Sequence, residues 1–282
     1  MKNAKINGIK IYTPNSRGSL IAFAKEKKKA LVALNAEKIM TLNDNRKEFV
    51  NKNVGYADGI GAVFALRKKG YKESKKIPGC ELWLEVIKSN FPKNKFYLIG
   101  GSENTIQATV KKLKEEFRGI KIVGFRNGYF SSENQKDQLI YKIKKLRPDI
   151  IFVAMGSPKQ EDMIVTLQNH HSALCQGLGG SFDIYTNSVK RATKGYISKY
   201  FEWLFRLILE PRRIIRQAVL LKFIYKLVLN KLRLISYHSR TLFSSLNQKQ
   251  HINQHSNRHL INTPSKHRNN YWDCITNIFN QF

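Results

Sequence analysis

The first 195 residues repeat one pattern, a short apolar run followed by an amphipathic segment long enough for a helix. The runs are too continuous for strands with one face in water, so they indicate strands buried on both faces. We therefore predict an α/β domain over residues 1–195, with a Rossmann-like, mostly parallel sheet and helices on both faces. The expected strands are Ala30–Leu34, Phe96–Ile99, Lys121–Val123, Ile150–Met155 and Leu174–Leu178, and the expected helices are Asn43–Val50, Gly59–Lys69, Glu81–Ser89, Glu103–Phe117, Gln135–Leu146 and Lys159–Asn169.

Glycine-bearing turns follow three of these strands, at Gly100–Gly101, at Gly156 and at Gly177 to Gly180. The carboxyl ends of parallel strands meet at one edge of a sheet, and ligands of such sheets bind beyond that edge. We expect the functional site there, with Gly100 and Gly101 allowing a ligand to approach the backbone.

The charge of the chain is extreme. Lys and Arg number 50 against 20 Asp and Glu, which gives a formal net charge of +30. Such a charge attracts nucleic acid, an anionic membrane or phosphorylated substrates, without choosing among them. Cys80, Cys175 and Cys274 lie far apart and form no CxxC pair. We therefore predict no metal site and no disulfide framework, and a reducing cytoplasm is the simplest location.

The composition changes at residue 196. Residues 196–237 hold nine Lys or Arg and two Glu among many apolar residues. On a helix, an uncharged stripe that includes Tyr225 lies opposite the basic residues, which predicts a basic amphipathic helical appendage at an anionic membrane surface. The alternative is an ordinary helix packed on the domain. The start of the chain lacks an apolar signal region, and no run approaches the ~20 apolar residues of a membrane span. Membrane contact is thus expected to be peripheral. The polar tail, residues 238–282, is expected to be disordered.

The segment with most chemical content is Tyr56-Ala57-Asp58-Gly59-Ile60-Gly61. A carboxylate before two glycines at the start of a helix can face a ligand that approaches closely. The alternative is that Asp58 only caps the helix that follows it.

Two further turns bring polar residues to the same edge. The segment Met155 to Glu161 follows a strand directly, and its proline at a helix start places Gln160 and Glu161 at that edge. The alternative is that Ser157 and Glu161 only stabilise the helix. The turn before Asp183 carries backbone amides that could hold an anion.

Together these segments resemble the WecG/TagA/CpsF glycosyltransferase family. The resemblance runs from about Leu31 to Leu229, in the order and spacing of that family. The segments that carry it are ALNAEK (33–38), ADGIG (57–61), LIGGSE (98–103), NGYF (127–130), MGSPKQE (155–161), GLGGSFD (177–183), RA (191–192) and FEWLFRLILEPRR (201–213).

The resemblance implies an inverting, metal-independent transferase that needs no cofactor. Its members pass N-acetylmannosamine, its uronic acid or a related hexose from a UDP-sugar to a polyprenyl-diphosphate-linked sugar. They act in the assembly of surface polysaccharide or teichoic acid, at the inner face of the bacterial membrane. A homo-oligomer is possible, and no nucleic acid partner is expected. By the resemblance Asp58 is the general base, and the substrate is bound by Asn35, Gln160, Arg206, Arg213 and Arg216. From their positions at the sheet edge we also expect substrate binding at Gly100, Gly101, Glu161 and Asp183, and Lys76 is expected near the sugar site.

Two departures from the family pattern lie near the expected sugar site. Ala33 stands where relatives often carry Thr, and Lys76 stands where they often carry Arg. Lysine keeps the charge but lacks the planar fork that binds two oxygens at once. These departures bear on which sugar is bound and leave the class of enzyme unchanged.

Two rival hypotheses come from other classes of protein. The charge alone would suit a nucleic-acid-binding protein, but no helix-turn-helix, zinc pair or aromatic RNA-binding motif is found in the sequence. A Rossmann oxidoreductase would need a full GxGxxG and an acidic residue ~20 positions later. Neither is found at the first predicted strand.

Overall fold

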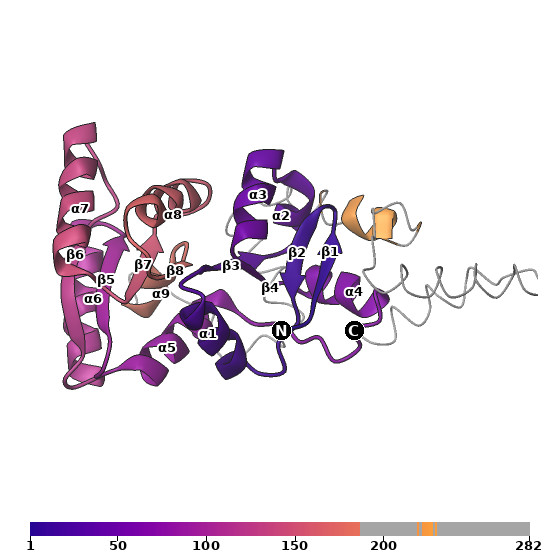
Figure 1. The fold of residues 1–282 in the computed structure, drawn as a ribbon, viewed down its shortest axis with the longest axis horizontal. Coiled ribbons are helices and arrows are strands. Elements are labelled where there is room, and N and C mark those ends of the chain that lie inside the picture. Colours follow the sequence, from indigo (N-terminus) through magenta and orange to yellow (C-terminus); the bar gives the residue numbers. More distant parts are fainter. Residues whose placement is uncertain (187–218, 220–221, 228, 230–282) are drawn as a thin grey trace, which may run out of the picture. The chain divides into compact units, whose positions relative to one another are not determined.

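The computed structural model describes residues 1–186, 219, 222–227 and 229 (Figure 1). Within them, eight strands form a single sheet in the order β1-β2-β4-β3-β8-β7-β5-β6. The strands are β1 (Asn3–Ile6), β2 (Ile9–Tyr12), β3 (Ala30–Leu34), β4 (Val54–Ala57), β5 (Lys95–Gly100), β6 (Lys121–Arg126), β7 (Ile150–Ala154) and β8 (Leu174–Gly177). The helices are α1 (Arg17–Glu26), α2 (Ala36–Thr41), α3 (Asp44–Lys52), α4 (Ile60–Lys68), α5 (Gly79–Asn90), α6 (Glu103–Glu116), α7 (Glu133–Leu146), α8 (Lys159–His170) and α9 (Ser181–Tyr185).

The sheet is mostly parallel, as the sequence predicts. β1 and β2 form an antiparallel hairpin, and every other pairing in the sheet is parallel. All five residues of β7 are buried, which agrees with its position between two other strands and two layers of helices. The carboxyl ends of β3, β4, β5, β7 and β8 therefore lie along one edge.

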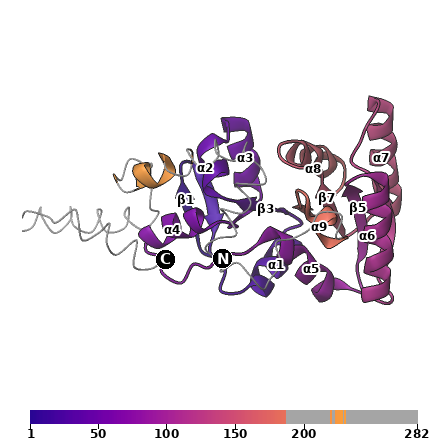
Figure 2. The same cartoon turned by 180° about the vertical axis from the view of Figure 1, so that it is seen from behind.

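Helices cover both faces of the sheet. Alternate residues of each strand point to opposite faces, and they separate the core into two clusters. One cluster contains buried residues of α2, α3, α4, α7 and α8, and the other contains buried residues of α1, α5, α6 and α9. Figures 1 and 2 show α2 and α3 on the opposite side of the sheet from α1 and α5. The predicted α/β architecture is confirmed.

The five predicted strands and six predicted helices are all present, with ends shifted by a few residues. β6 runs to Arg126 instead of ending at Val123. β1, β2 and β4 were not predicted, and neither were α1, α2 and α9. These strands have only four residues each, and in β1 and β2 buried residues alternate with more exposed ones, so neither contains an apolar run.

The turn after β5 depends on its glycines. Gly100 has φ of +131°, and a Cβ on it would lie 2.1 Å from the carbonyl oxygen of Ala154 in β7. Gly101 has φ of +66° and donates a hydrogen bond to the same carbonyl, at 3.0 Å. Only glycine fits so close to a neighbouring strand. At this point the chain leaves β5 toward β6 and leaves β7 toward β8, in opposite directions along the sheet. Such a reversal is where open α/β sheets bind ligands.

Most of the predicted appendage, residues 196–237, lies outside the described residues, as does the whole of the predicted tail, 238–282. Residues 222–227 are helical, and Phe223 and Leu227 are buried in the core. The Lys68 ammonium group donates to the Leu227 carbonyl at 2.5 Å. Ile224 and Tyr225 are exposed. This segment therefore packs on the core through the side that carries Phe223 and Leu227, which on a helix lies among the basic residues. Tyr225, which belongs to the uncharged stripe, is on the other side and is exposed. No helix in the described part of the chain is long and apolar enough to span a membrane.

Candidate active site

Asp58 follows β4 at the carboxyl edge of the sheet and is partly exposed. Its backbone N–H donates to the Leu34 carbonyl at the end of β3, at 3.0 Å. Its Oδ1 accepts a hydrogen bond of 2.7 Å from the N–H of Gly79, the first residue of α5. The cap of α4 is Gly59, without a side-chain hydrogen bond. The interpretation of Asp58 as the cap of the helix that follows it is therefore wrong.

The segment before α5 explains how Gly79 reaches Asp58. The N–H of Ile77 donates to the Ala57 carbonyl at 2.9 Å, so this segment runs beside the end of β4. The hydrogen bond to Gly79 fixes one oxygen of the carboxylate. No group in the described part of the chain donates to the other oxygen, Oδ2. Asp58 thus presents one free carboxylate oxygen at the functional edge.

Asn35 and Lys76 belong to segments that lie near the turn that carries Asp58. Asn35 caps α2, with its Oδ1 accepting from the Lys38 N–H at 2.8 Å. A Cβ on Gly59 would lie 3.1 Å from the Asn35 Cβ, so the two turns are in contact. Lys76 is exposed and directly precedes Ile77. The structure therefore brings Asn35 and the backbone of Lys76 to the region of Asp58.

Gln160 is buried, with 5% of its surface exposed. Its Oε1 accepts from the N–H of Gly179 at 2.8 Å. A Cβ on Gly177 would lie 2.7 Å from its Nε2, so glycine leaves room for the amide. Gln160 thus ties the turn after β7 to the turn after β8. The amide predicted to orient a substrate is engaged with the protein's own backbone.

Glu161 forms an ion pair that the sequence did not predict. Its Oε1 lies 2.8 Å from the Lys38 ammonium group, and the Ser157 hydroxyl donates to the same carboxylate. The side chains of Lys38 and Glu161 are 22% and 9% exposed. The bond to Ser157 links the turn before α8 to its first turn, as in the alternative interpretation, although no side chain caps the backbone at the start of α8. The pair to Lys38 adds a link between α2 and α8, across the sheet edge from β3 to β7.

Gly100, Gly101 and Asp183 form a second group on the same edge. Asp183 Oδ1 accepts from the Thr105 hydroxyl on α6 at 3.0 Å. A Cβ on Gly101 would lie 2.9 Å from the Thr105 Cγ2. The Gly101 carbonyl also accepts from the N–H of Gly128 at 2.9 Å, which brings the turn after β6 to this place.

Beside the second group is a cavity of about 490 Å³ at the end of β6. The Arg126 guanidinium lies 3.7 Å from the ring centre of Phe130 and donates to the Tyr129 carbonyl at 2.8 Å. The Asn127 amide donates to Glu103 at 2.7 Å and lowers the pKa of that carboxyl. The residues that line this cavity are Tyr97, Glu103, Phe125, Arg126, Asn127, Tyr129, Ser131, Gln135, Gln138, Leu139 and Lys142.

The chain matches the family model of the WecG/TagA/CpsF glycosyl transferases over residues 6–237. It belongs to this family. The protein is therefore a glycosyltransferase, and the hypothesis of a transferase is confirmed over the rival hypotheses.

From the sequence alone, Lys38, Gly79 and the residues that line the cavity after β6 were not predicted to lie at the candidate site. Lys38 and Asn127 lie inside segments that carry the resemblance, but no role could be assigned to them from the residues alone. Predicting the end of β6 at Val123 also separated Arg126 from the sheet edge. Arg206, Arg213 and Arg216 lie outside the described residues.

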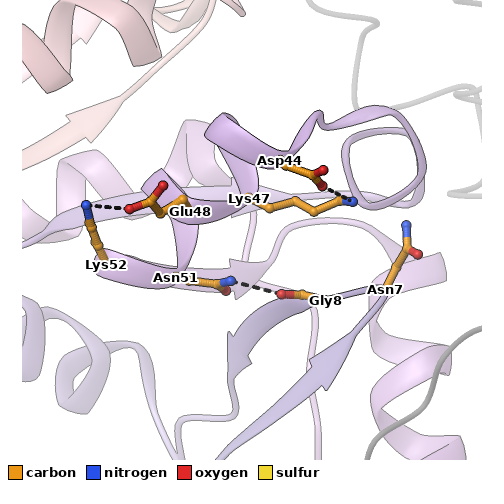
Figure 3. Close-up of a pocket in the computed structure, with 7 residues that line it drawn as sticks. All are labelled: Asn7, Gly8, Asp44, Lys47, Glu48, Asn51 and Lys52. Atoms are coloured by element: carbon orange, nitrogen blue, oxygen red, sulfur yellow. Dashed lines mark hydrogen bonds and ion pairs between the residues drawn. The ribbon is translucent and has the colours of Figure 1, made fainter.

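A second cavity, of about 510 Å³, lies between the β1–β2 turn and α3 (Figure 3). Its charged groups bond to one another, with Lys47 3.0 Å from Asp44 and Lys52 2.7 Å from Glu48. None of the predicted site residues lines it. In the part of the chain that the structure describes, no cluster of three or more His, Cys, Asp or Glu side chains is placed to hold a metal ion.

The Lys38–Glu161 pair should contribute measurably to stability because little water reaches it. We predict that Lys38→Met and Glu161→Gln, analysed singly and together by urea unfolding, show a coupling free energy above about 1 kcal/mol. Lys38→Met alone should cost about 1.5–3 kcal/mol, because the buried carboxylate loses its charged donor.

The matched control is the exposed pair Lys52–Glu48, whose side chains are 70% and 63% exposed. The same cycle with Lys52→Met and Glu48→Gln should give no measurable coupling. Equal coupling free energies for the two pairs would contradict the prediction that burial strengthens the Lys38–Glu161 pair.

Proposed function

We propose that this glycosyltransferase moves a hexose, N-acetylmannosamine, its uronic acid or a related sugar, from a UDP-sugar to a polyprenyl-diphosphate-linked sugar. The product would be an intermediate of surface polysaccharide or teichoic acid. The observation that carries the proposal is the carboxylate of Asp58, which is anchored through Oδ1 to Gly79 and receives no hydrogen bond at Oδ2 from the described residues. The membership of the family gives the class of reaction.

In the proposed step Asp58 Oδ2 takes the proton from the acceptor hydroxyl. The acceptor oxygen forms a bond to the anomeric carbon from the side opposite the leaving group, and the bond from that carbon to the UDP oxygen breaks. The configuration at the anomeric carbon inverts. General base assistance of this kind is typically worth ~10²–10⁴ in rate.

The leaving group gains negative charge on its diphosphate as the bond breaks. Arg206, Arg213 and Arg216 are proposed to stabilise that charge, since a guanidinium binds two phosphate oxygens at once. With these cations the reaction needs no metal ion or other cofactor. Asn35, Lys76, Gly100, Gly101, Gln160, Glu161 and Asp183 remain proposed substrate-binding residues. Of these, Gln160 and Glu161 would act mainly by holding the turns in place, because their side chains are buried and bonded to the protein.

The lipid-linked acceptor places the reaction at the inner face of the cell membrane. The net charge of +30 and the exposed Ile224 and Tyr225 support peripheral binding to anionic lipid, worth about 1 kcal/mol per basic residue near the surface. The protein should sediment with phosphatidylglycerol vesicles at low salt and leave them at high salt, and it should bind DNA less tightly than it binds those vesicles. Equal binding to neutral and anionic vesicles would contradict this placement.

The function can be tested with a panel of UDP-sugars, a short-chain polyprenyl-diphosphate-GlcNAc acceptor and identification of the product by mass. We expect one hexose to be added, at the same rate in the presence of EDTA. Asp58→Asn should lower kcat by about 10²–10⁴. Asparagine keeps an oxygen that can accept from Gly79, so the fold should be retained and only the proton acceptor lost.

The control is the thermal unfolding of Asp58→Asn, which should match that of the wild type. Wild-type turnover by a folded Asp58→Asn protein would rule out the general base. Transfer that stops on addition of EDTA would rule out the metal-free mechanism.

A further inference from the structure

Two polar side chains lie in the apolar core directly beneath Asp58. Tyr56 on β4 and Gln176 on β8 are both 0% exposed. Within the described residues, neither the Tyr56 hydroxyl nor the Gln176 Oε1 meets the geometry of a hydrogen bond, although Gln176 lies close enough to the Tyr56 hydroxyl to lower its pKa. Burying polar atoms without partners destabilises a protein, so such positions call for an explanation.

β3 lies between these two strands and allows the side chains to approach each other. Ala33 of β3 pairs with Tyr56 on one side, and Leu31 of β3 pairs with Gln176 on the other. Paired residues of parallel strands share a face, and this face is the one that α5 covers. Because Ala33 has only a methyl group, it leaves space above β3 for a third group between its neighbours.

That third group is the first residue of α5. The Gln176 Nε2 donates to the Gly79 carbonyl at 3.4 Å. A Cβ on Gly79 would lie 3.0 Å from the Tyr56 hydroxyl and 3.6 Å from the Ala33 Cβ. Gly79 therefore lies against the Tyr56 hydroxyl and accepts a hydrogen bond from Gln176, while its own N–H donates to Asp58 at 2.7 Å.

We propose that Tyr56 and Gln176 are positioning residues for Asp58, which hold Gly79 in place and so fix the direction of the carboxylate. The inference rests on the proposed function of Asp58 as general base. Burial and the charge of Asp58 both raise the pKa of the Tyr56 hydroxyl, which therefore stays protonated and neutral beneath the carboxylate. Neither side chain touches substrate, since both are fully buried.

The test uses Tyr56→Phe and Gln176→Leu in the full chain. Each variant should lower kcat about 10-fold to 100-fold, because a small misplacement of a catalytic group is costly. The KM for the donor should stay unchanged. Tyr56→Phe should unfold at the same or a higher temperature, because it removes a buried hydroxyl that forms no hydrogen bond of good geometry within the described residues. Substitution of a residue needed only for stability would instead lower the unfolding temperature and leave kcat unchanged.

The matched control is Ser74→Ala. The Ser74 hydroxyl is also buried without a partner, so its removal should have a similar effect on unfolding and none on kcat. Amide hydrogen exchange gives a readout that does not depend on activity. Exchange at Gly79 should be faster in Gln176→Leu than in wild type and unchanged in Ser74→Ala.

The same substitutions in the Asp58→Asn background separate this inference from the proposed function. Because the two residues act through Asp58, neither should slow the residual reaction further. Additional slowing there, wild-type kcat in both single variants, or unchanged Gly79 exchange would overturn the positioning role. If Asp58→Asn alone keeps wild-type kcat, the general base is what fails, and exchange at Gly79 still reports whether Tyr56 and Gln176 hold the peptide.

Discussion

The hydrogen bond between the Gly79 N–H and Asp58 Oδ1 joins two segments on which the rest of the site depends. It links the end of β4 to the start of α5, and the backbone bond from Ile77 to Ala57 lies directly beside it. A carboxylate held at one oxygen has a fixed direction, and its second oxygen remains available to a substrate. The glycine turns, the buried Tyr56 and the contact with Asn35 all surround this one bond. The catalytic proposal therefore concerns an anchored side chain on a rigid edge of the sheet.

The other polar residues at this edge mostly hold turns together. Gln160 ties the turn after β8 to α8, Lys38 and Glu161 tie α2 to α8, and Asp183 ties α9 to α6. These links restrict the movement of the turns at the sheet edge and keep their backbone N–H groups in place. Electrostatic stabilisation of a leaving group works best when the donors are already fixed before the reaction. Gln160, Glu161 and Asp183 thus bond mainly to other parts of the protein, and these bonds join the turns of the sheet edge.

The sequence predicted the central strands because their apolar runs are buried on both faces, a pattern that few other structures produce. It missed the β1–β2 hairpin because short strands with alternating burial contain no such run. Asp58 was found from its glycine neighbours, but its partner Gly79 lies 21 residues further along, and no local pattern shows that contact. Likewise, Gln160 could be placed at the edge by its strand and its proline, whereas the direction of its amide depends on Gly177 and Gly179 of another strand. Long-range contacts of this kind decide the roles of the side chains.

The central claim is that one carboxylate, Asp58, promotes a single displacement at the anomeric carbon. Glu161 is a poor candidate for a covalent intermediate, since it is buried and bonded to Lys38 and Ser157. The most direct measurement is the anomeric configuration of the first product, followed by NMR with the UDP-sugar that the enzyme accepts. The account predicts inversion relative to the donor. Retention of configuration would require a second displacement and would contradict it.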